Sequence, residues 1–187
     1  MTMMMNAINY TPSHPDQFQI EWGPEGTYAS RLISLESFAP DSILATLGPE
    51  TILTETKAYT SIQFKEETPT DRLIHLELNS DLVYINHSCE PNVSFVLENG
   101  IVGRDQHQWV LKSLCEIKKG QPLTFAYFST EWEMTQPFDC QCQSKKCLGR
   151  IEGAKFMDES ILSNENLMNI FWILDFDQQK GILLTII

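Results

Sequence analysis

The sequence predicts a β-rich domain, and two observations carry this prediction. Short runs rich in β-branched and aromatic residues recur along the chain, and Gly, Pro and Asn turn signals separate them. A helical spacing of apolar residues is confined to the C-terminal stretch 153–187. We therefore expect small strands joined by turns, followed by a short, partly helical tail.

The first strands follow a polar arm, residues 1–18, which carries two prolines. The run Gln19–Trp22 alternates as a strand does, residues 23–26 form a turn, and 27–33 is again β-prone. The segment 38–44 is expected to be a loop that leads into a third strand.

Two more β-prone pieces lie at 58–64 and 73–78, with a turn at 65–71 between them. The second piece alternates between apolar and polar residues and contains His75. We interpret His75 as a core or surface histidine rather than a catalytic one.

The second half of the chain continues the same pattern. Its β-prone runs lie at 81–85, 94–97, 101–104, 109–114 and 123–127. Asn99-Gly100 is a strong two-residue hairpin signal, so we expect 94–97 to pair with 101–104. A turn at 118–122 leads into the last strand.

The tail is the part of the chain with helical spacing. Asp158 or Ser160 is expected to cap a helix. Its apolar residues are Ile161, Leu162, Leu167, Met168, Phe171 and Trp172. This face either packs on the body of the domain or forms a homodimer contact.

Composition limits the classes of function. The chain has 187 residues, which suits one domain, and a formal net charge of −12, which argues against direct nucleic-acid binding. The N-terminal residues resemble no signal peptide, and no apolar run reaches the ~20 residues of a membrane helix. Five cysteines without a secretory signal favour a reduced, intracellular protein, cytoplasmic or nuclear.

Two polar strings are unusual. The first is Tyr84-Ile85-Asn86-His87-Ser88-Cys89-Glu90-Pro91-Asn92-Val93, which alone could be a polar turn after a strand. The second is Cys140-Gln141-Cys142, followed by Cys147-Leu148-Gly149-Arg150. Three thiolates at such short spacing suit zinc, which needs one more ligand to complete its tetrahedron. Redox chemistry or chance are the alternatives for the cysteines alone.

Together the two strings resemble the central motif and the post-SET cysteines of the SET-domain family of protein-lysine methyltransferases. The resemblance implies small curved sheets around a knot-like core, with a SET domain at 19–135, a post-SET zinc segment at 136–152 and the tail at 153–187. It also implies that structural Zn²⁺ binds to Cys89, Cys140, Cys142 and Cys147. Cys115 would then remain as a lone buried cysteine.

The family resemblance also assigns a cofactor, S-adenosylmethionine (SAM). A glycine turn ending at Gly26, with Thr27 and Tyr28 after it, would approach SAM through its backbone, although Pro24 replaces the family's first glycine. Asn86 and His87 would hold SAM. Phe138 and Leu148 would pack on its adenine.

The resemblance places the transfer chemistry at the end of the last strand. Tyr127 would supply the hydroxyl at the transfer point and contact the cofactor, and Ala126 stands where the family carries an aspartate. Tyr84 would line the lysine channel or the cofactor side. Phe125 would set how many methyl groups are added, the alternative being an ordinary core residue.

The predicted function is SAM-dependent methylation of the lysine ε-amine of a protein or peptide, histone-like or not. Two alternatives remain from the sequence. One is a catalytically idle SET-fold binding module, and the other is a SET-fold enzyme that acts on a small molecule.

Overall fold

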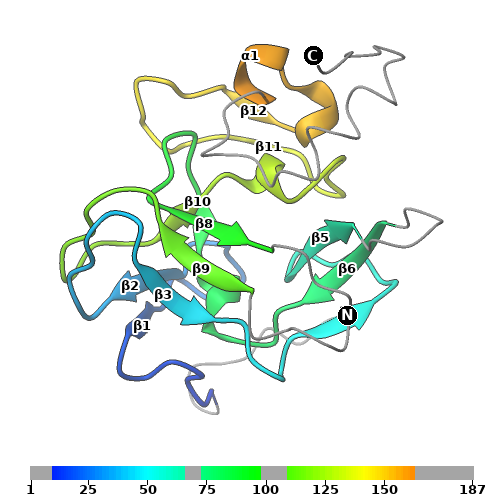
Figure 1. The fold of residues 1–187 in the computed structure, drawn as a ribbon. Coiled ribbons are helices and arrows are strands. Elements are labelled where there is room, and N and C mark those ends of the chain that lie inside the picture. The colour runs from blue at the N-terminus through cyan, green and yellow to red at the C-terminus, as the bar shows by residue number, and fades with distance from the viewer. Residues whose placement is uncertain (1–9, 66–72, 98–108, 163–187) are drawn as a thin grey trace, which may run out of the picture.

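A computed structural model describes residues 10–65, 73–97 and 109–162 of the chain. Its described elements are small strands, three 3-10 turns and one short helix (Figure 1). In chain order they are β1 Phe18–Glu21, β2 Arg31–Ser34, β3 Ile43–Thr46, β4 Ile52–Thr54, β5 Ser61–Lys65, β6 Leu73–Glu77, η1 Asp81–Tyr84, β7 Asn86–His87, β8 Val93–Val96, β9 Val110–Ser113, β10 Thr124–Phe125, η3 Tyr127–Ser129, β11 Phe138–Asp139, β12 Arg150–Ile151, η4 Ala154–Phe156 and α1 Glu159–Leu162.

The strands form several separate small sheets. Antiparallel pairing gives the sheets β1-β2, β11-β12, β3-β9-β8 and β4-β6-β5. The pair β7-β10 is parallel and short, with Asn86 opposite Thr124 and Phe125 opposite His87. This pair brings the central polar string beside the strand that precedes Tyr127.

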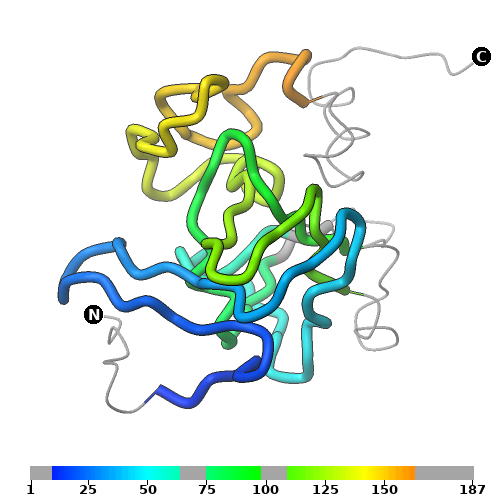
Figure 2. The backbone as a smooth tube through the Cα atoms, turned by 90° about the vertical axis from the view of Figure 1, so that its left-hand side faces the viewer, coloured from blue at the N-terminus to red at the C-terminus, as the bar shows by residue number. Residues whose placement is uncertain are grey.

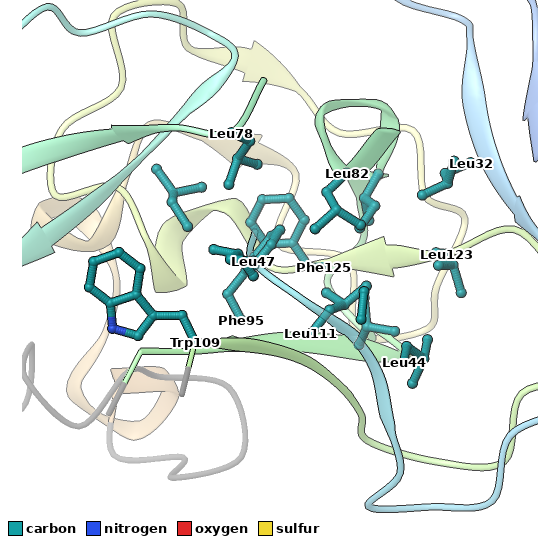
Figure 3. Close-up of a cluster of buried hydrophobic side chains, with 14 of the residues drawn as sticks. Leu32, Leu44, Leu47, Leu78, Leu82, Phe95, Trp109, Leu111, Leu123 and Phe125 are labelled. Carbon is teal, nitrogen blue, oxygen red and sulfur yellow. The ribbon is translucent and has the colours of Figure 1, made fainter. Parts of the chain in front are cut away.

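The main hydrophobic core lies between these small sheets. Alternation along β8 decides which side chains enter it: Val93 and Phe95 are buried, whereas Ser94 and Val96 are half-buried. Figure 3 shows Phe95 and Phe125 meeting within this cluster. Its other labelled members are Leu32, Leu44, Leu47, Leu78, Leu82, Trp109, Leu111 and Leu123.

A second, smaller cluster joins the C-terminal part of the described chain to this body. Phe128 and Cys89 from the body pack with Ile151, Ala154 and Met157. In Figures 1 and 2 this lobe, with β11, β12 and α1, lies at the opposite end of the molecule from β1 and β2.

One glycine is required where the lobe meets the body. Gly153 has a φ of +116°, and a Cβ on it would stand 2.5 Å from the backbone oxygen of Trp132. Next to this close approach, the backbone N–H of Ala154 donates to the carbonyl of Glu131 at 2.8 Å. A side chain at position 153 would push the lobe away from the residues that follow Tyr127.

Most predicted strands are present, but the run 81–85 is not one of them. Residues Asp81–Tyr84 form the 3-10 turn η1, in which the backbone N–H of Ile85 donates to the carbonyl of Leu82. The carboxylate of Asp81 accepts bonds from the backbone N–H groups of Ser13 and His14, which fixes the turn from outside the local sequence. The β-prone composition of the run is overridden by this tertiary contact.

Two sequence predictions fall partly outside the described residues. Strand β8 pairs with β9, and the Asn99-Gly100 turn with its second arm lies beyond the described range. The predicted C-terminal helix begins as α1, where the N–H groups of Ile161 and Leu162 both donate to the carbonyl of Asp158. Its continuation, with the homodimer contact proposed for it, also lies outside. Within the described ranges, no helix is long and apolar enough to cross a membrane.

Candidate functional site

The site centres on Tyr127, immediately after β10. Its hydroxyl donates to the carbonyl of Ile85 at 3.2 Å, and its backbone N–H donates to Nδ1 of His87 at the same distance. Both bonds follow from the parallel β7-β10 pairing, which runs the two segments side by side. Burial raises the pKa of the Tyr127 hydroxyl, so the phenol stays protonated and neutral at physiological pH.

His87 joins this site to the cysteine cluster. Burial lowers the pKa of its imidazole to about 4, so the ring is neutral. Because Nδ1 accepts the Tyr127 N–H, we assign the ring proton to Nε2. Nε2 lies 3.3 Å from Sγ of Cys89 and therefore donates toward that sulfur.

Aromatic rings enclose Tyr127. The ring centroid of Phe125 lies 4.8 Å from that of Tyr127, His87 lies at 5.3 Å and Phe138 at 5.9 Å. Phe138 comes from the lobe and Phe125 from β10, so the two parts of the chain close over the same side chain. Phe125 is also 5.0 Å from Phe95, which makes it a member of the core as well as a neighbour of Tyr127.

Asn86 connects the site to the start of β2. Its Nδ2 donates to the carbonyl of Ser30 at 3.0 Å. In the described part of the chain, Oδ1 of Asn86 has no hydrogen-bond partner, although the residue is half-buried. This leaves an acceptor available for a ligand. Nothing in the sequence pointed to Ser30, because the group that contacts Asn86 is a backbone carbonyl and gives no signal in the residue type.

The predicted glycine turn precedes Ser30 directly in the chain. Gly26 has a φ of +79°, and a Cβ on it would meet nothing within 4 Å. The turn is closed locally by the backbone N–H of Thr27, which donates to the carbonyl of Pro24 at 3.2 Å. Tyr28 is exposed, and its hydroxyl lies 3.4 Å from Oε1 of Gln136. The backbone segment that reaches Asn86 is therefore the one at Ser30.

Tyr84 contacts residues that the sequence analysis did not connect with it. Its ring centroid lies 5.3 Å from that of Trp22 and 5.8 Å from that of Tyr10. Tyr84 thus joins the N-terminal arm and the end of β1 to η1.

Four cysteines come together at the boundary between body and lobe. The Sγ atoms of Cys89, Cys140, Cys142 and Cys147 all lie within 4.8 Å of one another. Sγ of Cys89 and Sγ of Cys140 are 3.7 Å apart, close to the ~3.8 Å edge of a tetrahedron with ~2.3 Å zinc–sulfur bonds. The donor set and its spacing therefore fit a structural Zn²⁺.

The surroundings of the cluster suit thiolates held by a cation. The backbone N–H of Leu148 donates to Sγ of Cys89 at 3.4 Å, and that of Cys142 donates to Sγ of Cys140 at 3.4 Å. Burial raises the pKa of Cys89 to about 11 and also raises that of Cys140, so a bound cation must displace their protons. Cys115 is exposed, so the expectation that it is buried is wrong.

Comparisons of the sequence with known proteins identify a family. The sequence matches the SET domain over residues 19–128. It is 39% identical over 156 residues to the methyltransferase flvH of Aspergillus flavus, which covers 81% of this chain and 77% of that protein. It is 33% identical over 112 residues to a SET and MYND domain-containing protein of Dictyostelium discoideum, covering 53% of this chain and 26% of that protein.

Among solved structures, the chain is similar to KRYPTONITE, described in complex with mCHG DNA and SAH. The TM-score is 0.48 and the identity 22%, over 71% of this chain and 29% of that one. The family assignment rests on the sequence match, which spans more than half of the chain. The chain belongs to the SET-domain family of SAM-dependent methyltransferases, and it carries the four-cysteine cluster that suits a structural zinc ion.

Proposed function

We propose that this methyltransferase acts on the ε-amine of a lysine presented by a protein or peptide. The observation that carries the proposal is the placement of Tyr127. Its neutral hydroxyl donates a hydrogen bond to the Ile85 carbonyl, and the aromatic rings of Phe125 and Phe138 lie beside its own ring. SAM supplies an activated methyl group on a sulfonium, so the protein must align the two reactants and exclude water.

The acceptor amine must lose its proton before it can attack. With a reference pKa of about 10.4, holding a lysine neutral near pH 7.5 costs about 4 kcal/mol at ~1.36 kcal/mol per unit. An apolar, aromatic surrounding lowers this cost because it disfavours the charged form. Phe125 and Phe138, whose ring centroids lie 4.8 Å and 5.9 Å from that of Tyr127, provide such a surrounding.

Tyr127 acts as a positioning group and not as a base. Its raised pKa keeps the hydroxyl protonated, and the proton is directed at the Ile85 carbonyl. The oxygen lone pairs and the neighbouring carbonyl of Ile85 are then available to orient the N–H bonds of the acceptor amine. Alignment of this kind supplies several kcal/mol, up to ~7–11 in favourable cases.

For the cofactor, the residues present offer matching chemistry. Asn86 has an amide oxygen without a partner among the described residues, which can accept a bond from an ammonium or amine. The ring of Phe138, 5.6 Å from that of His87, can pack on the adenine, and Leu148 lies half-buried in the same lobe. We propose Phe125 as the residue that limits the number of methyl groups.

The free thiols support a proposal for the compartment. All five cysteines are free, and four of them must stay reduced to bind zinc, so we propose a reducing, intracellular location. No contact with nucleic acid or membrane enters this proposal.

The test is transfer of labelled methyl groups from SAM by zinc-loaded protein into a cell extract. Protein bands that disappear with Tyr127→Phe but persist with Tyr59→Phe, an exposed tyrosine, would support the proposal. Label found only in the small-molecule fraction would replace the protein acceptor with a small amine. No label in either fraction, with no SAM binding by calorimetry, would leave a SET-fold binding module.

A further inference from the structure

Three aromatic rings meet at a corner on the N-terminal side of the molecule. They belong to Tyr10 of the arm, Trp22 after β1 and Tyr84 of η1. The ring centroids are 5.6 Å apart for Tyr10–Trp22, 5.8 Å for Tyr10–Tyr84 and 5.3 Å for Trp22–Tyr84. The three interplanar angles are 77°, 90° and 72°, so the rings stand nearly perpendicular to one another.

The corner is held in place by a buried carboxylate. Asp81 is 1% exposed, and it accepts the hydroxyl of Tyr10 together with the backbone N–H groups of Ser13 at 3.1 Å and His14 at 2.7 Å. Burial and this hydrogen bond raise the pKa of Tyr10, so the phenol remains a donor to Asp81. The N-terminal arm is thereby fastened to η1.

Trp22 is held by the residue that follows it. A Cβ on Gly23 would stand 2.7 Å from the backbone and side chain of Ala29, and the backbone N–H of Gly23 donates to the hydroxyl of Ser30 at 3.1 Å. These contacts fix the chain directly after the indole. Trp22 nevertheless remains 37% exposed, so a ligand can reach the ring.

A pocket opens beside the corner. Its volume is about 310 Å³, which lies at the lower end of the range for small-ligand sites. Tyr10, Trp22 and Asp81 line it together with the apolar side chains Phe18, Ile20 and Leu35.

The chemistry of this pocket favours a cation that does not need hydrogen bonds. Ring faces attract cations electrostatically, and the net charge of −12 adds a favourable field. Asp81 contributes negative charge, and the basic group paired with it in the described chain is His14, 3.9 Å away. However, the Asp81 oxygens already accept three hydrogen bonds. A primary ammonium, which is strongly hydrated, would lose its water without adequate replacement.

We propose that this pocket, lined by Tyr10, Trp22 and Asp81, binds a methylated ammonium group. A methylated lysine side chain and a free methylated amine both present this cation. This goes beyond the methyl transfer itself, because the pocket is built from the arm, β1 and η1 and needs no catalysis to be occupied. The site would let the protein recognise a molecule that is already methylated.

The test is calorimetric titration of the zinc-loaded 187-residue chain with N-acetyl-trimethyllysine amide. The controls are its unmethylated form and the neutral isostere in which a tert-butyl group replaces trimethylammonium. We expect the trimethyl compound to bind about tenfold more tightly than the isostere. Equal binding of the isostere would overturn the proposal.

Variants locate the site. Trp22→Ala should abolish the preference for the cation, Trp22→Phe should keep part of it, and Phe156→Ala, at an exposed aromatic on the lobe, should leave it intact. Unchanged binding by Trp22→Ala would overturn the proposal. Competitive displacement of the probe by SAM would also overturn it, because the probe would then occupy the cofactor site. Binding alongside SAM supports it, and the ranking of trimethyllysine amide against tetramethylammonium identifies the source of the cation.

Discussion

Nε2 of His87 lies 3.3 Å from Sγ of Cys89, while Nδ1 of the same ring accepts the backbone N–H of Tyr127. One imidazole therefore connects a sulfur of the cysteine cluster to the residue at the proposed transfer point. A hydrogen bond to a ligating sulfur orients it and tunes the bound metal.

Replacement of this imidazole is expected to affect the metal. His87→Phe keeps an aromatic ring but removes both nitrogens, and the affinity for zinc should fall by about 10–100-fold. Competition with a chromophoric chelator measures the change. Wild-type affinity in the variant would show that the His87–Cys89 contact has no effect on the cluster.

Loss of the metal is expected to release the lobe. Structural zinc sites contribute about 10–16 kcal/mol, comparable to the ~5–15 kcal/mol stability of a whole domain. Cys140→Ser should therefore increase amide exchange in residues 136–162 much more than in β3, β8 and β9. Cys115→Ser is the matched control, because Cys115 is exposed and outside the cluster. Equal protection of the lobe in both variants would contradict a structural metal.

The size of the residue at position 125 should control the product. Phe125→Tyr adds a hydroxyl beside Tyr127, whose ring centroid is 4.8 Å away, and leaves less room for a methylated amine. We expect the products to shift toward fewer methyl groups. Mass spectrometry of the products measures the shift. An unchanged product distribution would identify Phe125 as a core residue alone.

Glu131 makes stability depend on pH. Burial raises the pKa of its carboxyl to about 8, and Lys57, 3.6 Å away, offsets this only in part. Among the described residues, Oε1 of Glu131 is buried without a hydrogen-bond partner. The pKa of Glu131 in the folded state lies above the unfolded value of about 4.3, so the folded state holds this proton more tightly than the unfolded state. The contribution of this proton to the free energy of unfolding is therefore complete below about pH 4.3, and it is lost as the pH rises through 8.

Glu131→Gln should remove this loss. As the pH rises from about 5 to about 9, the free energy of unfolding of the variant should increase by a few kcal/mol relative to that of the wild type, at ~1.36 kcal/mol per unit of pKa shift. Urea denaturation at both pH values measures the gain. The control is Glu133→Gln, whose carboxylate is 54% exposed and pairs with Lys155. A parallel pH dependence in all three proteins would argue against a buried, protonated Glu131.

Local pattern predicted most of the strands but not how distant segments meet. The β-prone runs 73–78 and 109–114 correctly gave β6 and β9. In β9, Leu111 and Ser113 are buried and Val110 and Lys112 are half-buried, as expected of a strand with one face toward the core. The run 81–85 was wrongly predicted as a strand, since Asp81 is held by backbone groups of the arm that no local pattern reveals. The β-rich fold with a C-terminal cysteine segment is confirmed.

The candidate site was predictable only through the family resemblance. Spacing indicated three thiolates, whereas the fourth, Cys89, came from the resemblance, and the structure brings all four together. Ser30 escaped prediction because its contribution is a backbone carbonyl. The corner of Tyr10, Trp22 and Tyr84 escaped because its rings are far apart in the sequence and share no periodicity.

The pairing of β7 with β10 has a consequence for the order of folding during synthesis. Asn86 and His87 cannot pair until Thr124 and Phe125 have left the ribosome, and Cys89 meets Cys140 only later still. Contacts of such long sequence separation form slowly, because the loop between them must close first. Once residues up to about Thr130 have left the ribosome, the main core can assemble while Cys89 still has none of its sulfur partners. Capture of zinc is thus a late step, which closes the site over a body that has already folded.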